Sequence, residues 1–477
     1  MVFTAKVQRN QQLASANHNL FSNFATKYSE MKNFWPFFFL FLGLIACSAE
    51  DDDEADERPI IPGAPASPRG PFNRTVLVYI SGENGLSYYI DEELQEIRKG
   101  SAGIGQNALV VYVDDSNAQR NPYILWIKEG KTMDSLTLEN DPLSSSVETM
   151  SYVLNYASTY YPAEEYGLVL WGHASGWLFE DSLVEQQSAF APRKAYGIDN
   201  GMNNNSDKGK WMNMSTLAKT LWEWKHLKFI FADCCQFQCI ESAYELRNVT
   251  DYIIGSPAEI PGVGAPYDTV VKGFFDSSDS FYETIVDNYF RQTIPTGLYS
   301  SDGWNVSYYD SKTPLSVIKT SELRNLAEAT NSVLHTFLPY EGEKAPELMD
   351  EKLIYYYGNS NNKKYSLMYD MNDVIRHYTL DNQAAYDTWK DAFDKCVVYR
   401  KNADKGWMTK YQIQAYVFFD GILTDERYGG VSMFVPQERK GTNYYPYTNK
   451  GVNYDGYNAD IKKTSWYSAA RLQEFGW

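Results

Sequence analysis

The clearest hydrophobic pattern in the sequence is a series of short apolar runs, most of them followed by a segment with helical spacing. Uninterrupted apolar runs are typical of strands that are buried on both faces of a parallel sheet. The runs lie at 76–80, 108–113, 167–171, 229–232 and 252–256. Strands that alternate with helices indicate a mainly parallel, three-layer α/β sheet, which we expect to occupy a first domain at 73–270.

The pattern changes near residue 270, where helical segments become more frequent than strands. We predict helices at 280–289, 316–338, 369–377 and 382–398, and late strands at 415–419 and 430–435. Residues 271–477 are therefore expected to form a C-terminal accessory region of mixed helices and strands, packed on the first domain.

The N-terminal part of the chain has the features of a secretory signal. A single lysine precedes an apolar stretch at 34–46, which is too short to span a membrane. The stretch ends in Leu-Ile-Ala-Cys47, which resembles a bacterial lipobox and implies cleavage before Cys47 and lipid attachment to its thiol. Residues 1–47 are thus expected to be an upstream extension, with Met31 as the true start, and a lipoprotein signal peptide.

Residues 48–72 are predicted to be a tether, because acids and then Pro, Gly, Ala and Ser cannot pack a core. An acidic run directly after a lipidated cysteine resembles the surface-export signals of some Gram-negative lipoproteins. We therefore expect a protein anchored to the outer membrane by lipid, in the cell envelope and exposed at the cell surface.

The composition favours a globular protein and argues against one class of partner. Of 477 residues, 44% are hydrophobic, which is enough to bury sizeable cores. The formal charge of −18 leaves no basic stripe to neutralise phosphates, which argues against nucleic acid as a partner.

Candidate chemistry gathers at the ends of two predicted strands. The run at 229–232 leads into Asp233, Cys234, Cys235 and, three residues on, a further thiol at Cys239. His173 follows the run at 167–171 among small residues. Because parallel strands end at one edge of a sheet, the imidazole and a thiol are expected to face each other there, which is the minimum for a cysteine nucleophile.

Plainer interpretations exist for the same residues. Free cysteines are among the most buried residue types, and a single histidine in a loop often has only a structural role. The five cysteines form neither a disulfide framework nor a zinc site, since the Cys235–Cys239 spacing has no second pair of ligands.

Three segments together resemble the clostripain family of cysteine peptidases, which belongs to the caspase-like clan. They are VLWGHASGW at 169–177, FADCC at 231–235 with the helical segment after it, and SPAEIPGVGAPYD at 256–268. The resemblance implies a caspase-like three-layer fold, His173 as the catalytic histidine and Cys235 as the nucleophile. Ala174 and Cys234 depart from the family pattern, which has Gly and Ala at these positions.

The resemblance also implies a substrate class. Family members cleave after Arg or Lys, and the cation needs a carboxylate. Asp233 is the first candidate, followed by Glu259 and Asp268, although Asp233 is equally suited to cap the next helix. The backbone N–H groups of Ala174 and Cys235 are the candidate oxyanion hole.

Two further properties of relatives bear on this chain. Some relatives process themselves between the His and Cys motifs, where the loop at 178–210 offers Arg193, Lys194, Lys208 and Lys210. No cofactor is required by the mechanism, but calcium is known for some relatives, and the acidic pair Asp114-Asp115 is a candidate place for it. Solvated acids are the plainer interpretation of that pair, and no metal site is predicted from it.

A second class of function competes with the enzyme. The chain has 38 Tyr and 12 Trp, and surface lipoproteins often use aromatic side chains to bind glycans. A catalytically silent, peptidase-like module that binds glycan or protein would not need His173 and Cys235 together, so this pair distinguishes the two classes.

Overall fold

The structure is a computed structural model, and it describes ten stretches of the chain. These are residues 64–179, 195–206, 209–292, 312–338, 354–357, 368–403, 406–408, 416–418, 424–435 and 454–475. In these stretches we find no helix with the length and apolar character that a membrane span requires. The chain from Ile60 to Trp477 forms one compact unit.

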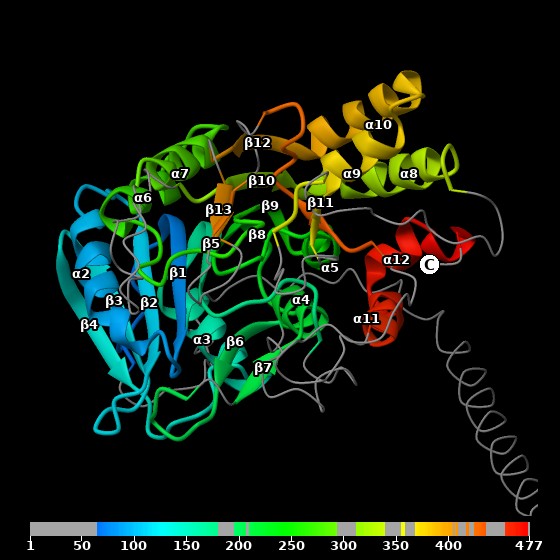
Figure 1. Cartoon of the computed structure of the whole chain (residues 1–477). Helices are drawn as coiled ribbons and strands as arrows, with labels where there is room; N and C mark the ends of the chain where they lie inside the picture. The colour runs from blue at the N-terminus through cyan, green and yellow to red at the C-terminus, as the bar shows by residue number, and fades with distance from the viewer. Residues whose placement is uncertain are drawn as a thin grey trace, which may run out of the picture. The chain divides into compact units, whose positions relative to one another are not determined.

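A nine-stranded sheet lies at the centre of the fold, in the order β12-β10-β9-β8-β5-β1-β2-β3-β4 (Figure 1). The five middle strands are parallel to one another, as predicted. They are β1 (Phe72–Gly82), β2 (Ala108–Asp115), β5 (Ala163–Gly172), β8 (Leu227–Asp233) and β9 (Thr250–Gly255).

Antiparallel strands extend the sheet at both edges. One edge carries a hairpin of β3 (Tyr123–Lys128) and β4 (Lys131–Thr137). The other edge carries β10 (Leu315–Lys319) and β12 (Val397–Lys401), which come from the C-terminal part of the chain. The division into domains at residue 270 stays a prediction, but strands from both sides of it share this one sheet.

Side chains of the central strands pack alternately into two cores, because successive residues of a strand point to opposite faces of the sheet. Along β1, Leu77 and Tyr79 lie in one core. Val76, Val78 and Ile80 lie in the other. The continuous apolar runs in the sequence therefore reflect burial on both faces.

Helices cover both faces, which confirms the three-layer prediction. One face carries α2 (Ile90–Gly100), α6 (Tyr267–Phe274) and α7 (Phe281–Phe290), which Figure 1 shows together. The opposite core is covered by α3 (Val147–Tyr160), α4 (Met214–Trp222), α5 (Ile240–Glu245), α8 (Leu323–Leu334), α9 (Met371–Tyr378), α10 (Gln383–Cys396), α11 (Tyr454–Asp460) and α12 (Ser465–Ala469).

Short elements complete the described structure. Three two-stranded sheets pair β6 (Tyr196–Asp199) with β7 (Lys210–Met212), β11 (Tyr369–Asp370) with β15 (Ser432–Met433), and β13 (Gly406–Met408) with β14 (Tyr416–Phe418). Single 3-10 turns lie at Ser87–Tyr89, Leu246–Asn248, Thr320–Glu322, Ile461–Lys463 and Leu472–Phe475.

Two segment predictions were wrong. The helix predicted at 316–338 begins only at Leu323, because the apolar Leu315–Lys319 run pairs with β9 as a strand instead. The polar loop at 178–210 contains strand β6, which pairs with β7. Neither strand of this short hairpin has the alternation that marks a longer strand.

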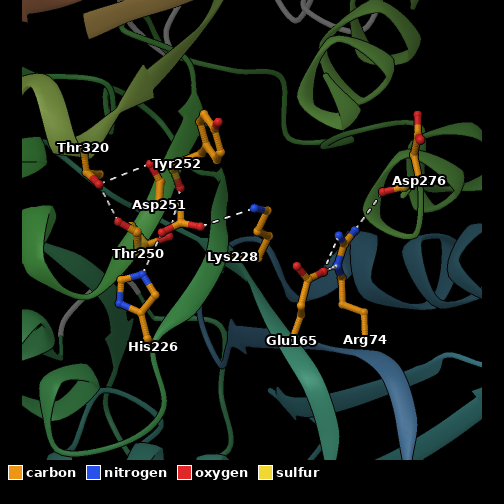
Figure 2. Close-up of polar contacts among 9 residues, drawn as sticks. All are labelled: Arg74, Glu165, His226, Lys228, Thr250, Asp251, Tyr252, Asp276 and Thr320. Atoms are coloured by element: carbon orange, nitrogen blue, oxygen red, sulfur yellow. Dashed lines mark hydrogen bonds and ion pairs between the residues drawn. The ribbon is translucent and has the colours of Figure 1, made fainter. Parts of the chain in front are cut away.

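A buried arginine ties the sheet to the helical layer. Arg74 of β1 donates from Nε and Nη2 to Glu165 Oε2 of β5, at 2.9 and 2.6 Å. Its Nη1 donates to the carbonyl oxygen of Phe274 at 2.7 Å and to that of Asp276 at 3.0 Å. Figure 2 shows the contacts with Glu165 and Asp276. The guanidinium thus joins two strands to the connection between α6 and α7.

Figure 2 also shows a second polar group, at the amino end of β8, which is more open to solvent. His226 and Lys228 both contact the carboxylate of Asp251, at 2.8 and 3.4 Å. The Asp251 side chain is 43% exposed, against 7% for Arg74.

These two groups predict unequal effects on stability. Arg74→Ala leaves the buried Phe274 carbonyl and the partly buried Asp276 carbonyl without this donor, and should lower the free energy of unfolding by about 2–4 kcal/mol. Lys228→Ala removes an exposed ion pair and should cost less than about 1 kcal/mol. Urea unfolding of both variants checks the difference, and equal midpoints would contradict it.

Candidate active site

The register of β5 and β8 brings the two candidate residues to the same edge of the sheet. These strands are parallel neighbours, and Trp171 pairs with Asp233. His173 and Cys235 each follow this pair by two residues. Since neighbouring strands lie about 4.8 Å apart, the two residues leave the sheet at one level from adjacent strands.

The loops that carry these residues also touch. Gly176 has φ +64°, and a Cβ there would lie 2.9 Å from the Gln236 carbonyl oxygen and 3.1 Å from Cys239 Sγ. Only a glycine permits this approach and this backbone conformation together. Gln236, directly after Cys235, has φ 55°, an uncommon backbone conformation for a residue with a side chain.

Strand β6 holds the histidine loop from outside. The Gly197 N–H donates to the His173 carbonyl at 2.9 Å, and the Ser175 N–H donates to the Ala195 carbonyl at 3.2 Å. In this antiparallel bridge the flanking residues make the hydrogen bonds, so the N–H of Ala174 points away from β6. This is the orientation that an oxyanion hole at Ala174 would need, because the N–H is not used in the pairing with β6.

Cys235 is the half-buried thiol of the cluster. Its Sγ accepts from the Ile260 N–H at 3.5 Å. Burial raises the pKa of the Cys235 thiol to about 12, and the negative charge of Glu259 contributes to this rise. The group is therefore a protonated thiol in this conformation, and it needs a base to become a nucleophile.

The other described thiols are buried. Cys234 donates to the Leu170 carbonyl at 3.0 Å, and Cys239 donates to Ser242 Oγ at 3.1 Å. Cys396 is buried at the end of α10. The expectation that Cys234 fills space, and that Cys239 faces inward, agrees with these contacts.

The remaining described histidines lie away from this edge. His226 is at the amino end of β8. His335 contacts Glu474 at 3.3 Å, and His377 lies on α9 against Tyr378. His173 is thus the described histidine that shares an edge with Cys235.

Asp233 is buried and turned into the layer of α6 and α7. Its carboxylate accepts from the Ala265 N–H at 2.9 Å, the Tyr267 hydroxyl at 3.0 Å and the Tyr289 hydroxyl at 3.3 Å. The alternative that Asp233 caps the next helix is wrong, because the N-cap of α5 is Cys239.

A second carboxylate, Glu93 of α2, lies beside Asp233 and was missed from the sequence. A Cβ at Gly264 would lie 2.6 Å from Glu93 Oε1 and 2.8 Å from Asp233 Oδ2. Glu93 is 2% exposed. The signal for it was its place on the apolar stripe of α2, next to Leu94 and one turn from Ile90 and Ile97.

The two buried carboxyl groups have no ion-pair partner in the described part of the chain. Burial raises the pKa of both, and the charge of Asp233 raises that of Glu93 further. The three hydrogen bonds that Asp233 accepts lower its pKa, so the negative charge resides on Asp233 and the proton on Glu93.

The other predicted acids do not belong to this buried pair. Glu259 is near Cys235 and half-buried. Asp268 of α6 forms an ion pair with Lys99 at 3.0 Å. Asp114 and Asp115 are buried, so the interpretation of this pair as solvated acids is wrong.

Some predicted residues lie outside the described part of the chain. These are Cys47, Arg193, Lys194 and Lys208. Lys210 is described, as the first residue of β7 opposite Asp199.

Comparisons with known proteins agree with this geometry. The family model of the clostripain family matches residues 78–475. A secreted C11 cysteine protease from Bacteroides thetaiotaomicron, solved with an irreversible peptide inhibitor, is 28% identical with a TM-score of 0.62. An inactive zymogen C11 protease from Parabacteroides distasonis is 25% identical with a TM-score of 0.62.

Each of these two matches covers 84% of this chain and 99% of the solved one. No curated protein matches the chain. Because the family model matches residues 78–475, which are most of the sequence, the chain belongs to the clostripain family and is a cysteine peptidase.

Proposed function

We propose that this peptidase cleaves peptide bonds after Arg or Lys, with Cys235 as nucleophile and His173 as its base. The observation that carries the proposal is the buried pair of Asp233 and Glu93, which has no cation within the described residues. A buried carboxylate without a cation is costly, and a substrate guanidinium or ammonium would compensate it.

The mechanism is acyl transfer. His173 takes the proton of the Cys235 thiol, and the thiolate attacks the scissile carbonyl carbon. The resulting oxyanion accepts from the N–H groups of Ala174 and Cys235. His173 then gives its proton to the leaving amine, and a water that it activates hydrolyses the thioester.

Specificity depends on the depth of the acidic pair. The side chain of Arg or Lys is long enough to bring its charge to a buried carboxylate while its stem passes apolar surface. Trp171, whose Nε1 would lie 3.2 Å from a Cβ at Gly264, and the rings of Tyr267 and Tyr289 border the two carboxylates. Glu259, whose negative charge acts on the Cys235 thiol, is a further candidate to attract the cation of the substrate.

We also propose that the mature chain is attached to the outer membrane by lipid at Cys47 and acts in the cell envelope. The support is the apolar stretch at 34–46, the lipobox after it and the acidic tether at 48–72. A surface peptidase on such a tether would meet protein substrates outside the cell.

The catalytic proposal is tested with a pair of cysteine variants. Cys235→Ala should lower kcat/KM for a reporter peptide that ends in Arg by roughly 10⁴-fold, because the nucleophile is gone. Cys234→Ala should retain cleavage, since this buried thiol only donates to Leu170. Retained activity in Cys235→Ala, or its loss in Cys234→Ala alone, would refute the assignment.

The role of Asp233 in substrate binding is tested by charge removal at two acids. Asp233→Asn should lower kcat/KM for Arg peptides by roughly 100-fold, because the cation loses its counter-charge. Asp268→Asn, at a partly exposed pair with Lys99, should change it by less than about threefold.

The Asp233→Asn variant should also differ from the wild type in the pH dependence of kcat/KM. Protonation of Asp233 removes the charge that attracts the substrate, so kcat/KM of the wild type should fall as pH drops through the raised pKa of Asp233. This loss should begin at less acidic pH than for an ordinary aspartate, and it should be absent in Asp233→Asn. If the fall of kcat/KM at low pH persists in Asp233→Asn, a group other than Asp233 causes it.

Self-cleavage between the two motifs is a further proposal. Ala195, where the described part of the chain resumes in this loop, is buried, and its N–H donates to Ser175 Oγ at 3.1 Å. Cleavage at Arg193 or Lys194 would therefore separate the two sides of the loop and leave β6 in place. The variant Arg193→Ala/Lys194→Ala should remain uncut there and be less active. Mass spectrometry that shows an intact 178–210 loop in fully active wild-type enzyme would refute the proposal.

A further inference from the structure

A tryptophan from a later part of the sequence lies beside the candidate catalytic histidine. The ring centroids of His173 and Trp211 are 6.4 Å apart, and the two rings are tilted by 46°. Centroid separations of about 4.5–7 Å are typical of aromatic rings that interact. Trp211 belongs to β7, so the fold must bring this strand to the loop that follows β5.

Strand β6 brings the two residues together. Tyr196 of β6 forms a bridge with Ala174 on one side and pairs with Met212 of β7 on the other. The side chains of Ala174, Tyr196 and Met212 are all buried in the same core. Successive residues of an extended chain point to opposite sides, so the residues just before Ala174 and Met212 direct their side chains to the other side. These residues are His173 and Trp211.

The residue of β6 that lies opposite His173 is a glycine. The Gly197 N–H donates to the His173 carbonyl oxygen at 2.9 Å. Gly197 has φ +61°, and a Cβ there would lie 2.7 Å from Ser81 Oγ, so this position is suited to glycine alone. Gly197 has no side chain that could separate the two rings, and the long indole of Trp211 spans the intervening strand.

The indole is held in place by packing. Trp211 is half-buried, and its Nε1 is inaccessible to solvent and has no hydrogen-bond partner among the described residues. A buried donor without an acceptor costs free energy, so the N–H group itself does not fix the ring in this position. A phenylalanine at 211 would therefore keep an aromatic ring beside His173 and lose no hydrogen bond.

We propose that Trp211 is a positioning residue for His173. In the proposed mechanism the imidazole takes the proton of Cys235 and later gives it to the leaving amine, so the ring must stay in one orientation through both steps. An indole packed beside the imidazole restricts rotation of that ring about its side-chain bonds. The inference rests on the proposed role of His173 as the base of Cys235.

The kinetic test compares three tryptophan variants. Trp211→Ala should lower kcat for a reporter peptide that ends in Arg by about tenfold and change KM by less than about twofold, because only the orientation of the imidazole is lost. Trp211→Phe should keep kcat within about threefold of the wild type, since an aromatic ring remains. Trp222→Ala, at a 66% exposed position of α4, should change neither constant. A raised KM with an unchanged kcat in Trp211→Ala would make Trp211 a substrate contact and overturn the proposal.

Alkylation of Cys235 separates this inference from the proposed function. Iodoacetamide reacts with the thiolate, so its rate at neutral pH, followed on the Cys235 peptide by mass spectrometry, reports how well His173 takes the thiol proton. His173→Ala and Trp211→Ala should both slow the reaction, by roughly tenfold or more, and Trp211→Phe should slow it much less. If His173→Ala has no effect, the proposed role of His173 fails. If His173→Ala slows the reaction and Trp211→Ala does not, that role stands and the inference about Trp211 is overturned.

Magnetic resonance tests the ring contact without catalysis. The chain has five histidines, so labelling them with ¹³C in the ring gives few signals, and the spectrum of His173→Ala identifies the signal of His173. Trp211→Ala should shift this signal, because the ring current of the indole is removed, and should leave the signal of His226, at the amino end of β8, in place. Trp211→Phe, whose ring current is weaker, gives the same test where Trp211→Ala does not fold. An unchanged His173 signal would overturn the proposal.

Discussion

The pairing of β5 with β8 is the constraint on which the rest of the site depends. A slip of one residue would turn every side chain of β8 to the opposite face of the sheet. Packing opposes such a slip at Gly167, where a Cβ would lie 2.6 Å from the ring of Phe229. That ring stacks on Phe274 at 5.6 Å, so the apolar core sets the level at which His173 and Cys235 leave the sheet.

Much of this was predictable, because the decisive features are local in the sequence. Apolar runs marked the central strands, and the residues just after them had to meet at one edge. Glu93 was not predictable as a partner of Asp233, because the sequence of α2 does not show which strand end the buried face of this helix packs against. The β6–β7 hairpin was missed for a similar reason: its seven residues are stabilised by the histidine loop and the sheet edge rather than by their own pattern.

Two groups of buried acids contribute to the formal charge of −18. Asp233, with the protonated Glu93 beside it, lies on the α6–α7 side, and the buried side chains of Glu83, Asp114 and Asp199 lie near the ends of β1 and β2. Neither group is compensated by a described basic residue, so each costs stability that packing elsewhere must offset. Uncompensated buried charge is typical of sites that bind an ion or a charged ligand.

The strands that complete the sheet have a consequence for any shorter form of this protein. β9 carries the end of the catalytic layer, and its free side is covered only by β10, whose residues lie more than 50 positions further along the chain. A fragment that stopped after α7 would leave β9 as a bare edge with Ile253 and Ile254 beside unpaired backbone groups. Such an edge pairs readily with other chains, so solubility of the catalytic half depends on the half that carries none of the proposed catalytic residues.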